Sequence, residues 1–137
     1  MVEVFLLEKR AKVLLVEDEP LISDVAAEAL EEQGFIVEAV SNASDALRRL
    51  QAGSVVDILF TDINLPGGMD GAALARRARE LRPDLPVIYT SGRGQATNLA
   101  DPVEGAMFVP KPYDPFNLGR LLEYLVVAKR THAQGFA

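Results

Sequence analysis

Short apolar runs alternate with amphipathic stretches along most of this chain. Runs of roughly four to eight apolar residues between turn-forming residues are typical of buried β-strands. Five such runs predict strands at residues 12–16, 35–40, 55–61, 87–90 and 106–109. Between the runs, apolar residues recur every three or four positions, which predicts amphipathic helices. These helices are expected at residues 20–33, up to residue 52, at 71–81 and from residue 115 onward.

This order of elements predicts one α/β domain, a doubly wound parallel sheet with helices on both faces. We divide the chain into an N-terminal extension (1–11), the domain (12–129) and a C-terminal tail (130–137). The segment from 92 to 105 is the least regular, and a short helix is expected there at about 95–100. One apolar stripe of the first helix is expected to face the core, and it consists of Leu21, Ile22, Val25, Ala26, Ala29 and Leu30.

Composition narrows the class of protein and its compartment. The chain has 137 residues, of which 49% are hydrophobic and 25% charged, as in ordinary globular domains. Its net charge of −6 argues against direct nucleic-acid binding. No apolar stretch approaches the ~18 residues of a membrane span. Cysteine is absent, which excludes thiol chemistry and favours a reducing compartment. We therefore expect a cytoplasmic protein that acts without nucleic acid or membrane.

Chemically active side chains follow the predicted strands, at the point where each strand ends. Glu17 and Asp18 follow the first strand, Asp62 the third, Ser91 the fourth and Lys111 the fifth. Because the carboxyl ends of parallel strands meet at one edge of a sheet, where ligands bind, these groups are expected to converge. Three carboxylates repel one another, and a hard cation such as Mg²⁺ relieves that repulsion. Each residue taken alone is equally explained as a solvated charge or a capping group, but their joint placement favours a metal and phosphoryl site.

The same residues suggest a reaction. A carboxylate such as Asp62 can attack phosphorus and form an aspartyl-phosphate. Lys111 is then expected to hold one phosphoryl oxygen as a point charge, and Ser91 to donate a hydrogen bond to another. Phosphoryl transfer needs mainly positioning and electrostatic stabilisation, and this set of residues supplies both.

Five motifs in this order resemble the receiver domain of two-component response regulators, over residues 12–128. The motifs are Val16–Pro20, Phe60–Pro66, Met69–Gly71, Pro86–Gly92 and Phe108–Pro112. The resemblance implies a flavodoxin-like fold, with five parallel strands in the order 2-1-3-4-5.

By this resemblance, Asp62 accepts a phosphoryl group from a sensor histidine kinase or a histidine phosphotransfer protein, in a Mg²⁺-dependent step. Lys111 and Ser91 contact the phosphoryl group. The expected Mg²⁺ ligands are Glu17, Asp18, Asp62 and the backbone carbonyl of Asn64. The chain is then a signalling phosphoacceptor rather than an enzyme with an outside product.

The resemblance also implies a switch and its tuning. Ser91 and Phe108 match the switch pair, in which the aromatic ring turns inward as the hydroxyl approaches the phosphate. Asn64 and Arg93 match positions that tune the lifetime of the phosphate. The Lys111–Pro112 bond is expected to be cis. The output is expected to be a downstream protein target, and a homodimer is left open.

Departures from the family pattern refine the subfamily. The loop 65–71 is one residue longer than the commonest form, and the span from Ser91 to Lys111 is slightly short. These features resemble receivers found alone or attached to sensor kinases. Two alternatives remain: a phosphohydrolase of the haloacid-dehalogenase type, and a receiver-like scaffold that works without phosphate. The first usually needs a second aspartate at the position of Asn64, whose amide cannot shuttle a proton.

Overall fold

A computed structural model describes residues 10–92, 99 and 101–133 of the chain, without the side chains of 130–133. Its core is a five-stranded sheet in the order β2-β1-β3-β4-β5, and every neighbouring pair is parallel. The strands are β1 (Lys12–Val16), β2 (Ile36–Val40), β3 (Ile58–Asp62), β4 (Val87–Ser91) and β5 (Met107–Pro110). The predicted fold class and strand order are therefore confirmed.

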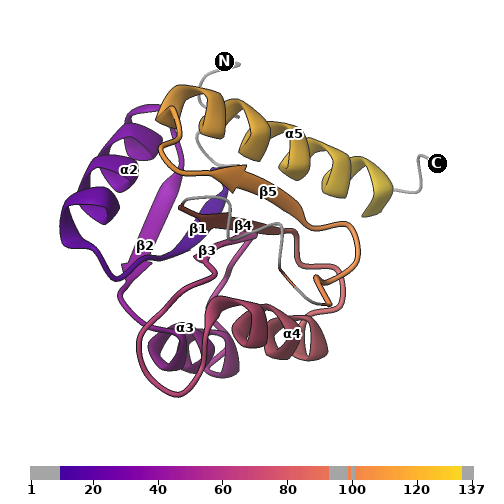
Figure 1. Cartoon of the computed structure of the whole chain (residues 1–137). Coiled ribbons are helices and arrows are strands. Elements are labelled where there is room, and N and C mark those ends of the chain that lie inside the picture. The colour runs from indigo at the N-terminus through magenta and orange to yellow at the C-terminus, as the bar shows by residue number, and fades with distance from the viewer. Residues whose placement is uncertain (1–9, 93–98, 100, 134–137) are drawn as a thin grey trace, which may run out of the picture.

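Two layers of helices enclose this sheet (Figure 1). Helices α2 (Pro20–Glu32) and α5 (Pro115–Ala133) cover one face, and α3 (Ala43–Gln51) and α4 (Gly71–Leu81) cover the other. Successive residues of a strand point to opposite faces, so each central strand feeds both layers. Within β3, for example, Phe60 packs in the α2/α5 core and Leu59 in the α3/α4 core. Both side chains are fully buried.

Local hydrogen bonds determine where the helices α3 and α4 begin. The side chain of Asn42 accepts a hydrogen bond from the Asp45 backbone N–H at 2.8 Å. Asp70 does the same for Ala73 at 2.8 Å. Such caps satisfy N–H groups that have no partner inside the helix. Helix α4 is also tied to the sheet, because the Gly71 N–H donates to the Ile63 carbonyl at 2.8 Å.

The strands and the sequence prediction differ most at the start of β3 and at β5. Strand β3 begins at Ile58, three residues later than expected; at Asp57 the side chain, rather than a backbone carbonyl, accepts from the Lys12 N–H, which interrupts the ladder. Strand β5 was expected to be buried, but it lies at the edge of the sheet and most of its residues are exposed. An edge strand has a neighbour on one side only, which explains this exposure.

Part of the predicted core stripe of the first helix is exposed in the structure. Leu21 and Val25 belong to the predicted core stripe of the first helix, yet they are 80% and 62% exposed. The sheet covers only the part of the stripe around Ala26 and Leu30, so the prediction was wrong for Leu21 and Val25.

Helix α5 continues to Ala133, beyond the expected domain end at 129. The helix expected at 95–100 lies almost entirely outside the described residues. Within the part of the chain that the structure covers, no helix is long and apolar enough to cross a membrane.

Candidate functional site

The predicted acidic cluster forms at the carboxyl edge of the sheet. Glu17 and Asp18 directly follow β1, and Asp62 is the last residue of β3. These two strands are neighbours, so their ends deliver the three side chains to one place. One carboxylate oxygen from each of Glu17, Asp18 and Asp62 lies within 4.8 Å of the others. The three carboxylates that were expected to converge at this edge are therefore close together in the structure.

Lys111 forms ion pairs with two of these carboxylates. Its Nζ lies 2.7 Å from Asp62 Oδ2 and 2.8 Å from Glu17 Oε1. Glu19 Oε1 lies further away, at 3.8 Å. Lys111 follows β5 immediately, and the Lys111–Pro112 peptide bond is cis, as expected. One cation therefore bridges carboxylates that come from two strand ends.

Burial controls the electrostatics of this group of charges. Glu17 is 3% exposed and Asp62 is 5% exposed. Burial raises the pKa of Glu17, and its hydrogen bonds with Lys111 and the Glu19 N–H offset this only in part. Burial acts to lower the pKa of Lys111, but its hydrogen bonds to Asp62 and Glu17 raise that pKa well above its ordinary value. The site therefore keeps its lysine charged and disfavours a further buried negative charge.

The donor atoms fit a hard divalent cation. Three carboxylates within 4.8 Å offer the oxygen ligands that Mg²⁺ prefers. The buried Glu17 Oε1 pairs with Lys111 Nζ at 2.8 Å and has no other partner among the residues that the structure describes. A buried carboxylate oxygen in that state has capacity for another positive partner. The carboxylates of the expected magnesium site are thus suitably placed, and the role of the Asn64 carbonyl stays a prediction.

Ser91 and Asn64 form a second contact at the same edge. Ser91 is the last residue of β4 and is buried. Asn64 Nδ2 donates a hydrogen bond to Ser91 Oγ at 3.1 Å, and the Asn64 backbone N–H donates to Asp62 Oδ1 at 3.0 Å. Asn64 therefore contacts both the expected acceptor and the expected switch hydroxyl.

Phe108 and Arg93 are the two remaining predicted site residues. Phe108 lies on the edge strand β5 and is 41% exposed, and its expected role in the switch stays a prediction. Arg93 lies outside the described residues, and its expected role stays a prediction.

Tyr113 is the residue that sequence reasoning missed. Its ring packs edge-on against Phe60, with centroids 5.4 Å apart. Its hydroxyl oxygen is buried and has no hydrogen-bond partner within the described part of the chain. The only sequence signal was its place two residues after Lys111, which by itself does not reveal burial beside charged groups.

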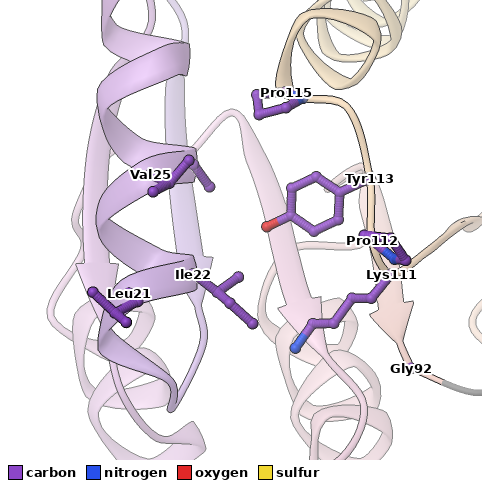
Figure 2. A pocket seen from close by; sticks show the side chains of 9 residues that line it. Leu21, Ile22, Val25, Gly92, Lys111, Pro112, Tyr113 and Pro115 are labelled. Carbon is purple, nitrogen blue, oxygen red and sulfur yellow. The ribbon is translucent and has the colours of Figure 1, made fainter.

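An apolar groove adjoins the acidic cluster (Figure 2). The groove encloses about 580 Å³ between α2 and the segment that joins β5 to α5. Leu21, Ile22 and Val25 line one side, while Lys111 and Tyr113 line the other and point toward α2. The exposed residues of the predicted core stripe therefore form a surface that is continuous with the charged site.

The environment of Tyr113 gives a testable pH dependence. Burial, followed by the nearby negative charge of Glu17, raises the pKa of Tyr113 to about 12, while Lys111 lowers it and Asp62 raises it further. The unfolded phenol ionises near its ordinary pKa of about 10, so stability is lost as pH rises from about 10 through about 12. The raised pKa of Lys111 has the same effect on stability. The folded state favours the charged amine, so it loses stability when rising pH deprotonates Lys111.

We expect the difference in phenolate absorbance between the metal-free wild type and Tyr113→Phe to have its midpoint near pH 12. The fold should be checked by circular dichroism at each pH. A difference curve centred near pH 10 would show that the Tyr113 hydroxyl is not in the environment described above.

Fold and site together define a class of protein: a doubly wound α/β domain with an acidic, lysine-bridged site at the carboxyl edge of its sheet. The chain matches the family model of the response regulator receiver domain over residues 13–123. It therefore belongs to the receiver domain family of two-component response regulators.

Individual relatives agree with this assignment. The response regulator receiver protein CpdR of Brucella abortus is 34% identical over 119 residues, which cover 85% of this chain and 98% of CpdR. The C4-dicarboxylate transport transcriptional regulatory protein DctD of Rhizobium meliloti is 36% identical over 103 residues. That match covers 74% of this chain but only 22% of DctD. The chain thus corresponds to nearly all of one relative and to about a fifth of the other.

Solved structures show the same fold. A response regulator receiver protein from Sinorhizobium medicae superposes with a TM-score of 0.82 at 30% identity. The match covers 88% of this chain and 97% of the other.

Proposed function

We propose that this chain is a phosphoacceptor of a two-component or phosphorelay system, with Asp62 as the residue that accepts the phosphoryl group. The observation that supports this best is the position of Lys111, whose Nζ lies between Asp62 and Glu17 at 2.7 and 2.8 Å. Asp18 completes a carboxylate set with the composition of a magnesium site. The phosphodonor is a histidine kinase or histidine phosphotransfer protein, and the output is another protein.

The chemistry follows from the groups at the strand ends. An Asp62 carboxylate oxygen forms a bond to phosphorus as the bond from phosphorus to the donor histidine nitrogen breaks, and the imidazole leaves with that electron pair. The Asn64 backbone N–H holds Asp62 Oδ1 and orients the carboxylate. Lys111 transfers one of its ion contacts from Asp62 to a phosphoryl oxygen. Mg²⁺, when bound by Glu17, Asp18 and Asp62, supplies positive charge that stabilises the phosphoryl oxygens.

The roles of the surrounding residues belong to the same proposal. Ser91 donates a hydrogen bond to the phosphoryl group, and Phe108 turns inward in response. Asn64 and Arg93 tune the lifetime of the aspartyl-phosphate. We further propose that the chain acts in the cytoplasm as a phosphorylation-controlled protein-interaction module or phosphate relay.

The two alternatives make different demands on the site. A haloacid-dehalogenase-like phosphohydrolase needs a proton-shuttling group two residues after its nucleophile, where this chain has Asn64. The Asn64 amide is instead engaged with Ser91. A phosphate-independent scaffold has no need for a lysine that is held between buried carboxylates.

The proposal is tested by incubating the protein with acetyl phosphate in the presence of Mg²⁺ and measuring its intact mass. We expect a gain of one phosphoryl group, and little or no gain when the metal is chelated. If no phosphoryl group is gained, a Mg²⁺ titration separates the remaining explanations. Mg²⁺ binding without phosphorylation would indicate a site that needs its own kinase, whereas failure to bind Mg²⁺ would favour the scaffold.

A further inference from the structure

The Ser91 hydroxyl is already engaged in this structure. Among the described residues, it donates to the Gly92 carbonyl at 3.3 Å and accepts from Asn64 Nδ2 at 3.1 Å. A serine hydroxyl has one proton to donate, so Ser91 cannot bind a phosphoryl oxygen without first redirecting that proton. If Ser91 Oγ itself moves toward Asp62, the hydrogen bond that it accepts from Asn64 is strained or broken.

Asn64 is well anchored for holding this hydroxyl. Its backbone N–H is fixed to Asp62 Oδ1 at 3.0 Å, so the position of residue 64 is defined relative to the acceptor. The Ser91 backbone is fixed as well, because its carbonyl accepts from the Lys111 N–H at 2.9 Å. The Asn64 side chain thus spans the ends of two strands that are neighbours in the sheet.

We propose that the Asn64 side chain is a positioning residue that retains the Ser91 hydroxyl in its unphosphorylated position and so sets the threshold for switching. This proposal rests on the function proposed above and concerns the regulation of the same site. It differs from an effect of Asn64 on water attack, because it acts through Ser91 and changes how strongly the site binds a phosphoryl group. The expected size is that of one neutral hydrogen bond, roughly two- to tenfold in an equilibrium constant.

The test is a double-mutant cycle on the binding of a phosphoryl analogue. Beryllium fluoride is titrated at fixed Mg²⁺ into the wild type, Asn64→Ala, Ser91→Ala and the double variant, and the Kd is measured by isothermal titration calorimetry. We expect Asn64→Ala to bind the analogue roughly two- to tenfold more tightly than the wild type. In the Ser91→Ala background the same change should alter the Kd by less than about twofold, because the coupled partner is absent.

Two further variants sharpen the cycle. Ser91→Thr keeps a hydroxyl, so in this background Asn64→Ala should again tighten binding. Asn117→Ala changes an exposed asparagine on α5 and should leave the Kd unchanged. Thermal unfolding of each variant establishes that all of them are folded.

The outcomes separate this proposal from the proposed function. If the wild type binds the analogue and accepts phosphate, but Asn64→Ala leaves the Kd unchanged or shifts it equally without the Ser91 hydroxyl, the positioning role is wrong and the receiver function stands. If the wild type neither binds the analogue nor accepts phosphate from any donor, both proposals fail.

Discussion

Asp62→Asn is expected to abolish phosphoryl acceptance while leaving the domain folded. Asparagine has nearly the shape of aspartate, but its amide is neutral and is not a nucleophile for phosphorus. Lys111 keeps its contact with Glu17 at 2.8 Å, so the variant does not leave the lysine buried without a partner. The measurement is the intact mass after incubation with acetyl phosphate and Mg²⁺, with the wild type treated in parallel.

Asp57→Asn is the matched control for this experiment. Asp57 lies at the amino end of the same segment, where its side chain accepts from the Lys12 N–H at 2.8 Å, at the edge of the sheet opposite the acidic cluster. It should be phosphorylated like the wild type. A phosphoryl group that persisted on Asp62→Asn would place the acceptor elsewhere, and Asp18 would then be the first residue to examine.

Asp62→Asn has a second expected consequence, at Lys111. Among the interactions that raise the pKa of Lys111, the hydrogen bond to Asp62 is the largest. Removing it should move that pKa down toward its ordinary value, since burial and Glu17 then act alone. NMR detection of the Lys111 side chain during an alkaline titration would show the change, and an unaltered lysine pKa would argue against the ion contact described here.

The convergence of Glu17, Asp62 and Lys111 could be predicted because it depends on topology alone. Once the apolar runs are read as parallel strands, the residue after each run must lie at one edge of the sheet. No knowledge of side-chain packing is needed for that step. The strand order could not be predicted from this topological argument alone, because alternating strands and helices are compatible with more than one order of strands in the sheet. The family resemblance was needed to choose among them.

Features that depend on packing could not be predicted in this way. Leu21 and Val25 have the helical spacing of core residues, but they line the groove beside the site and stay exposed. Tyr113 is half-buried because its ring meets Phe60 from β3, a contact between residues far apart in the sequence. The hydrogen bond from Asn64 to Ser91 likewise depends on side-chain conformations at two strand ends. Sequence periodicity carries no signal for such pairs.

Gly71 illustrates the same limit, because the sequence shows only one more glycine in a glycine-rich loop. In the structure, a Cβ at position 71 would lie 1.8 Å from the backbone oxygen of Asp62 and 2.9 Å from Ile63 Cα. The absence of a side chain lets the first turn of α4 pack directly against the end of β3. Helix α4 could accommodate a methyl group only by moving away from the strand that ends in Asp62.

We therefore expect Gly71→Ala to destabilise the domain by about 3 kcal/mol or more, equivalent to a fall of roughly 10 °C in Tm. Gly119→Ala is the matched control, because its Cβ would also lie 1.8 Å from another atom, but that atom is Oε1 of the Gln33 side chain. Gln33 can rotate away, losing its hydrogen bonds to the Ala29 and Pro115 carbonyls at 3.0 and 3.2 Å, and alanine favours the helix by up to ~1 kcal/mol. Gly119→Ala should thus stay within about 1 kcal/mol of the wild type in urea-induced unfolding. Equal losses of stability in the two variants would contradict this account. The prediction requires that the backbone atoms beside residue 71 cannot move aside, whereas the flexible Gln33 side chain beside residue 119 can.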